Sequence, residues 1–65
     1  MPKRTRKQQA VYDVLVEAKN PVWVWVVHWA TGRTDSSARH LLNALVRRGD
    51  VRRLPGRPAR YEAIR

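Results

Sequence analysis

The chain has 65 residues, which is enough for one small domain but leaves little apolar surface for its core. It has no cysteine, which excludes disulfides and a cysteine-ligated zinc site, and its two histidines, His28 and His40, are too few for a metal site without several nearby carboxylates. Lysine and arginine number 14 against 5 acidic residues, a net charge of +9, so the expected partner is a polyanion.

No apolar run reaches the length of a membrane-spanning helix, and the start, Met1 to Arg4, lacks the apolar core of a signal peptide. The cations are spread along the chain instead of gathering on one helical face, which argues against a helix that lies on a membrane. We therefore expect an intracellular protein, in the cytoplasm or nucleoid, with no membrane partner.

Residues 1–4 are expected to form a flexible basic arm, and residues 5–65 a single domain that begins with a helix. Thr5 and Gln8 have the spacing of a capping box, in which each side chain bonds the backbone N–H of the other residue. Apolar residues then recur on one helical face until Asn20 and Pro21 stop the helix.

The segment 22–31, with the sequence VWVWVVHWAT, is compatible with two structures. Its alternating β-branched and aromatic residues suit a strand, whereas the following Gly32 indicates the end of a helix. We expect an extended stretch at 22–24 and then a helix over 25–31. A strand throughout the segment is the alternative.

Three tryptophans lie within this segment, at positions 23, 25 and 29. A helix that turns Val27 and His28 inward brings Trp25 and Trp29 together on another face, four residues apart. Packing in the core is one explanation for these side chains, a partner surface is a second, and stacking on unpaired bases is a third. His28 is expected to be a hydrogen-bonded core residue.

Thr34 is a good N-cap for a third helix over 34–48, and Gly49 is the residue expected directly after its end. The apolar stripe of this helix consists of Ala38, Leu41, Leu42 and Leu45. At about 100° per residue, a polar side points away from that stripe. It carries Ser36, His40, Asn43 and Arg47, with Arg39 on one flank.

A basic hairpin is expected over 51–64. Its strands are 51–54 and 60–64, because the intervening PGRPA sequence is suited to a turn and not to a central strand. The cations of the hairpin are Arg52, Arg53, Arg57 and Arg60.

This order of elements resembles the winged helix-turn-helix family of DNA-binding domains over residues 5–65. The motifs that carry the resemblance are Ala30-Thr31-Gly32 at a helix end, the spacing Ala38…Leu42…Leu45…Gly49-Asp50-Val51, and Gly56-Arg57 followed by Tyr61. The resemblance implies a mainly α fold with a small β-hairpin, in which three helices pack with a two- or three-stranded antiparallel wing sheet. It also implies binding to double-stranded DNA.

Two positions depart from the pattern of that family. Arg33 stands in a turn that is usually apolar, and Ala38 is smaller than the Val or Ile that is common at its position. We hypothesise that Trp25 or Trp29 fills the volume that Ala38 leaves in the core.

Charge and resemblance together predict sequence-specific binding to duplex DNA by a small transcriptional regulator. The helix over 34–48 would enter the major groove, where Arg pairs with guanine and Asn with adenine, and the wing over 51–64 would contact the backbone or minor groove. The contacts expected from the helix are Ser36, Ser37, Arg39, His40, Asn43 and Arg47; from the wing, Arg52, Arg53, Arg57 and Arg60; and from the arm, Lys3, Arg4, Arg6 and Lys7.

A protein-interaction module that uses segment 23–29 is one alternative, with a second copy or another protein on Trp25 and Trp29. Binding to RNA or to single-stranded nucleic acid is another. We expect no enzyme, no catalytic residue, no metal and no cofactor, because the sequence has no paired nucleophile and base, no glycine-rich phosphate loop and no metal-ligand cluster.

Overall fold

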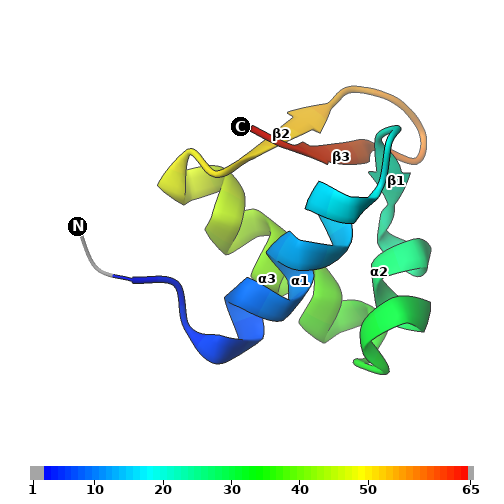
Figure 1. Cartoon of the computed structure of the whole chain (residues 1–65). Coiled ribbons are helices and arrows are strands. Elements are labelled where there is room, and N and C mark those ends of the chain that lie inside the picture. The colour runs from blue at the N-terminus through cyan, green and yellow to red at the C-terminus, as the bar shows by residue number, and fades with distance from the viewer. Residues whose placement is uncertain (1–2, 65) are drawn as a thin grey trace.

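The computed structural model describes residues 3–64; residues 1, 2 and 65, which belong to the predicted arm and domain end, lie outside this range. Along the described chain the elements are α1 (Arg6–Glu17), β1 (Val22–Trp23), α2 (Val24–Thr31), α3 (Asp35–Arg48), β2 (Val51–Leu54) and β3 (Arg60–Ala63) (Figure 1). The strands form one antiparallel sheet in the order β1-β3-β2. Three helices with this small sheet make a winged helix, as predicted.

Local capping fixes the ends of the first and third helices. Both halves of the predicted capping box of α1 are present, since Thr5 Oγ1 accepts from the backbone of Gln8 and the Gln8 side chain accepts from the backbone of Thr5. Thr34 caps α3 in the same way, accepting from the backbone of Ser37. The helix ends at Arg48 and is capped by Gly49, whose φ of 85° is a left-handed conformation that favours glycine.

The segment 22–31, whose sequence is compatible with a strand or a helix, forms a short strand followed by a helix. Only Val22 and Trp23 pair with β3, opposite Tyr61 and Arg60, and α2 begins at Val24, one residue earlier than predicted. A strand throughout is therefore wrong. The helical turn brings Val27 into the core, and this tertiary contact outweighs the strand preference of the valines and tryptophans.

The core gathers one or more side chains from every element. Its buried members are Val11, Leu15, Val22, Val27, Ala38, Leu41, Leu42, Leu45, Val51 and Tyr61. The four from α3 are the stripe that the sequence predicted. Ala38 is completely buried, but Trp25 and Trp29 are 54% and 79% exposed, so the hypothesis that one of them fills the space beside Ala38 is wrong.

The wing sheet has two faces of different character. In the register of β2 with β3, Arg53 lies opposite Tyr61, and Arg52 lies opposite Glu62. Because side chains alternate along a strand, Arg53 shares the face of buried Tyr61, which is turned toward the helices. Arg52 and Arg60 lie on the opposite face. β3 ends at Ala63, one residue earlier than predicted.

No helix within residues 3–64 combines the length and apolar character needed to cross a membrane.

Candidate nucleic-acid interface

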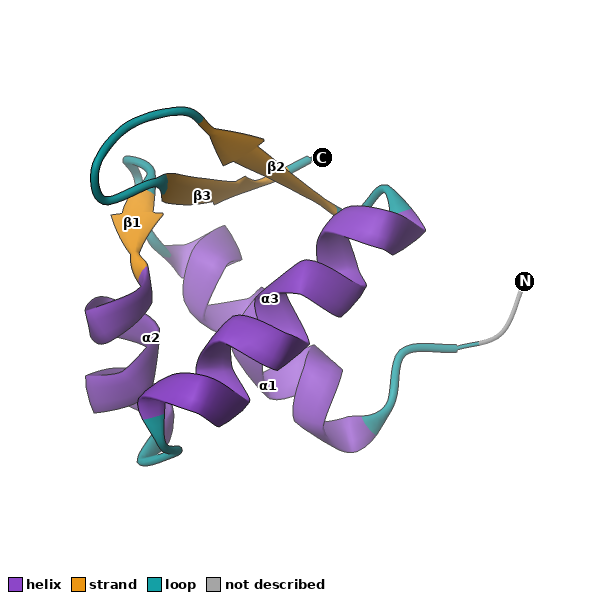
Figure 2. Ribbon diagram, turned by 180° about the vertical axis from the view of Figure 1, so that it is seen from behind, coloured by secondary structure: helices purple, strands orange, loops and turns teal. Residues whose placement is uncertain are grey.

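The outward side of α3 carries the polar residues that the sequence predicted. Seen from behind, α3 crosses in front of α1, with the wing sheet above it (Figure 2). Because the opposite stripe is buried, the polar side of the helix remains open to solvent. Its exposed residues are Ser36, Arg39, His40, Asn43 and Arg47, and Ser37 beside the cap is half-buried.

Arg39 is held by a neighbour on its own helix. Its Nε donates to Asp35 Oδ2 at 3.0 Å, and the Arg39 side chain is 64% exposed. A solvent-exposed pair four residues apart on a helix contributes only about 0.3–0.5 kcal/mol. A phosphate or a base edge can therefore compete for this guanidinium at small cost.

The four wing arginines are exposed, but the hairpin divides them among three positions. Arg53 is on the face turned toward the helices, whereas Arg52 and Arg60 are on the outer face of the sheet. Arg57 lies in the loop between the strands. Arg52 is also partly neutralised, because its Nε lies 3.5 Å from Glu62 Oε1 on the neighbouring strand.

A hollow of about 180 Å³ separates the beginnings of α2 and α3 from the hairpin, and we call it the helix–wing hollow. Its walls include Trp23, Trp25, Arg39, Arg53, Pro58 and Tyr61. Of the predicted contacts, Arg39 from α3 and Arg53 from the wing therefore face one concave surface. Trp23 was predicted as part of the segment 23–29 of the alternative interaction module, but not among the contacts of the nucleic-acid interface. Its position two residues before Trp25, where the strand changes to a helix, was the available signal.

Trp25 and Trp29 are both exposed on α2, four residues apart, as the helical interpretation of this segment predicted. Trp25 stacks on Trp23, with ring centroids 6.0 Å apart and planes 9° apart. Trp29 makes an edge contact with the ring of His28. His28 is hydrogen-bonded as expected, since its Nδ1–H donates to the backbone carbonyl of Arg33.

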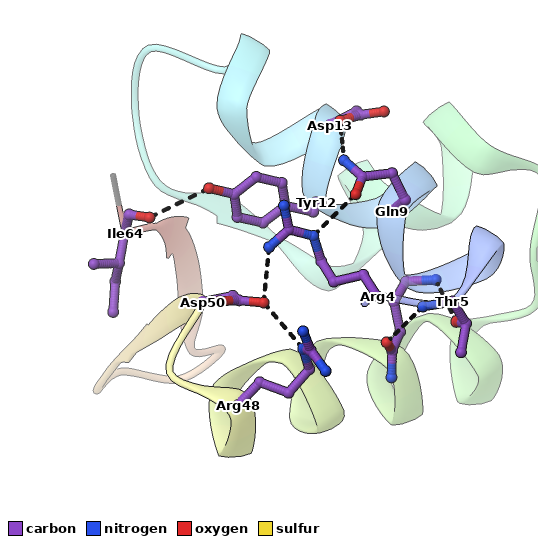
Figure 3. Close-up of polar contacts among 9 residues, drawn as sticks. Arg4, Thr5, Gln9, Tyr12, Asp13, Arg48, Asp50 and Ile64 are labelled. Carbon is purple, nitrogen blue, oxygen red and sulfur yellow. Dashed lines mark hydrogen bonds and ion pairs between the residues drawn. The ribbon is translucent and has the colours of Figure 1, made fainter. Parts of the chain in front are cut away.

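The basic arm is attached to the domain through Arg4 (Figure 3). Its Nη1 donates to Asp50 Oδ2 at 2.9 Å, its Nε donates to Gln9 Oε1 at 3.0 Å, and its guanidinium lies 3.9 Å from the centre of the Tyr12 ring. Arg4 is thus a contact within the fold. The exposed cations of this region are Lys3 in the arm, and Arg6 and Lys7, which were predicted as arm contacts but lie in the first turn of α1.

Asp50, between α3 and β2, receives two guanidinium groups. Besides Arg4, Arg48 Nε donates to Asp50 Oδ2 at 3.1 Å (Figure 3). The hydrogen bond from Arg4, followed by that from Arg48, holds the pKa of Asp50 below its usual value of about 3.8. The carboxylate therefore joins the arm to the end of α3.

The stabilisation of the fold by the ion pairs of Asp50 should be lost at acidic pH. Because the pKa of Asp50 is lower in the folded state than in the unfolded state, these contacts stabilise the fold above the unfolded pKa, and this stabilisation disappears as the pH falls through the folded pKa. Urea unfolding of the wild type and of Asp50→Asn should give a difference in stability that is present at neutral pH and shrinks below about pH 4. Glu17→Gln, which removes an exposed carboxylate at the end of α1, is the matched control. A stability difference that is constant with pH would contradict this account.

Within residues 3–64, no three His, Cys, Asp or Glu side chains come together in a group that could hold a metal ion.

The fold and this surface define a winged helix with a cationic, partly aromatic face. No protein-family model matches the chain. No curated protein matches its sequence either.

Proposed function

We propose that this domain binds double-stranded DNA and reads its sequence as a small intracellular transcriptional regulator. The observation that carries the proposal is the helix–wing hollow, where Arg39 from α3 and Arg53 from the hairpin line one concave surface. A duplex lying across α3 and the wing would meet cations from both elements at once. The net charge of +9 supports the same partner, because it attracts a polyanion over a distance.

In this proposal, α3 enters the major groove with its polar side. Arg39 and Asn43 are the candidates for base edges, since Arg forks onto guanine and Asn pairs with adenine through two hydrogen bonds. His40 and Arg47 lie on the same exposed side, where they supply further base or phosphate contacts. Ser36 and Ser37 lie at the helix start, which favours a phosphate.

The wing is proposed to contact the DNA alongside the helix. Arg53 lies on the face of the sheet turned toward the helices and lines the same hollow as Arg39. Arg57 is exposed in the loop and fits a narrow minor groove, which attracts arginine. Arg52 and Arg60, on the outer face of the sheet, are assigned to the neighbouring backbone.

Competition binding tests the proposal directly. A labelled duplex is displaced with unlabelled duplex DNA, single-stranded DNA and RNA at one fixed salt concentration, and a random duplex library then identifies any preferred sequence. We expect duplex DNA to compete best and the library to yield one motif. Equal competition by RNA or single-stranded DNA, or no enrichment from the library, would overturn the proposal.

The exposed arm cations should contribute to affinity without reading sequence. Replacing Lys3, Arg6 and Lys7 together by glutamine should reduce the slope of log K against log salt by roughly 0.9 for each phosphate that the arm no longer neutralises. Arg4 is left unchanged because it holds the fold through Asp50. The matched control is Lys19→Gln, an exposed cation after the far end of α1. An unchanged slope in the triple variant would reject the role of the arm.

A second candidate is a protein-interaction module, and one observation favours it. The helix α2 contains no acidic residue, lysine or arginine, and Trp29 on its outer side is 79% exposed. The partner on this apolar surface would be either a second copy of this chain or another protein. Light scattering over a range of protein concentrations, with and without duplex, tests self-association, which Trp29→Ala should abolish.

A further inference from the structure

The aromatic wall of the helix–wing hollow is a stacking platform with a fixed geometry. Trp23 is the last residue of β1 and also the N-cap of α2, so a strand and a helix together set its position. The ring of Trp25 lies parallel to it, 9° apart in plane and 6.0 Å in centroid distance. The two residues are 36% and 54% exposed, so their mutual contact does not bury them.

The cationic wall of the hollow comes from different elements. Arg39 belongs to α3. Arg53 belongs to β2 and lies on the same face of the sheet as Tyr61. The only carboxylate among the lining residues of this hollow is that of Asp35, which is paired with Arg39. The two guanidiniums therefore leave one positive charge uncompensated beside a flat aromatic surface.

This combination matches the two parts of a nucleotide. A base has an apolar face that stacks on an aromatic ring whatever its identity, and its phosphate is an anion that arginine binds. A hollow of about 180 Å³ is small, and a base that is stacked and paired within a duplex does not expose its face to it. The suitable ligand is a single unpaired nucleotide.

We propose that the helix–wing hollow binds one unpaired nucleotide of a DNA molecule, with its base stacked on Trp25 and its phosphate on Arg53. This inference rests on the proposed function, because it assumes DNA bound along α3 and the wing. It adds to that function a preference for DNA that carries an unpaired nucleotide. DNA carrying an unpaired nucleotide, either at an overhanging end or as a bulge within the duplex, binds more tightly than a fully paired, blunt duplex.

Three duplexes of one common sequence test the proposal: a blunt duplex, a duplex with a one-nucleotide overhang and a duplex with a one-nucleotide bulge. Fluorescence anisotropy at fixed salt gives the Kd of each. We expect the wild type to bind the overhang, the bulge or both about 5- to 150-fold more tightly than the blunt duplex. The two modified duplexes distinguish an end from an internal site. A 2-aminopurine at the unpaired position reports stacking independently, through quenching when protein binds.

Two tryptophan variants supply the matched comparison. Trp25→Ala should bind all three duplexes with the affinity of the wild type for the blunt one, and it should no longer quench 2-aminopurine. Trp25→Phe should retain part of the preference because it keeps an aromatic face. Trp29→Ala removes the more exposed tryptophan, outside the hollow, and should keep the full preference. Thermal unfolding checks that the variants remain folded.

The outcomes separate this site from the proposed function. Tight binding of all three duplexes with equal Kd overturns the nucleotide site and leaves duplex binding in place. Equal loss of the preference in Trp25→Ala and Trp29→Ala also overturns the site, because it indicates a general apolar effect. Binding of the modified duplexes without any binding of the blunt one would reject the duplex-reading function and keep the site. Binding of none of them rejects both.

Discussion

Arg39→Ala and Asn43→Ala are each expected to weaken binding to the preferred duplex by about 1–3 kcal/mol, with much smaller losses on unrelated sequences. Both side chains are exposed: Asn43 lies on the side of α3 away from its buried stripe, and Arg39 lies on the flank of that side. Each can make a paired set of hydrogen bonds to a base edge, and an alanine makes none. Kd values on the selected duplex and on a scrambled duplex of the same length measure the effect.

Asp35 supplies the control for Arg39. Removing Arg39 leaves the carboxylate of Asp35 without its ion-pair partner, close to an approaching polyanion, which would weaken binding to every sequence. The double variant Asp35→Asn, Arg39→Ala removes that repulsion and isolates the effect of the base contact. If the single and double variants weaken binding equally on all sequences, Arg39 is a phosphate contact and does not read a base.

Leu42→Ala is expected to destabilise the fold by about 2–5 kcal/mol, which lowers the Tm of a domain of this size by roughly 8–40 °C. Leu42 is completely buried, on the side of α3 that packs in the core. Its truncation removes apolar contacts and leaves a cavity in a small core. Thermal unfolding followed by circular dichroism measures the change.

Leu54→Ala is the matched control, because it is the same substitution at a partly exposed position on the outer face of the sheet. Leu54→Ala should destabilise the fold clearly less than Leu42→Ala does. This pair of variants also tests the orientation of α3. A mild effect of Leu42→Ala would mean that the helix turns a different side inward, and the proposed reading side would then be wrong as well.

Features that depend on neighbouring residues were predictable from the sequence. The caps at Thr5 and Thr34, the apolar stripe of α3 and the glycine at its end all involve residues close together in the chain, and the structure has each of them. The exposed polar side of α3 followed from the same periodicity.

Features that depend on distant residues were not predictable in this way. The Arg4–Asp50 ion pair joins positions 46 residues apart, and no local pattern indicates it. The helix–wing hollow likewise joins Trp25 to Arg53 through the folding of the hairpin. The exposure of each tryptophan was not predictable, because α2 has apolar residues on nearly every side. Such a helix has no periodicity that shows which residues face solvent.

The double pairing of Asp50 has a consequence for how the fold tolerates the loss of one partner. A substitution of Arg4 removes one guanidinium from the carboxylate, but Arg48 still donates to Asp50 Oδ2. The negative charge at the junction between α3 and β2 therefore keeps a counter-charge when the N-terminal segment is altered. The attachment of that segment and the neutralisation of this carboxylate are thus separable.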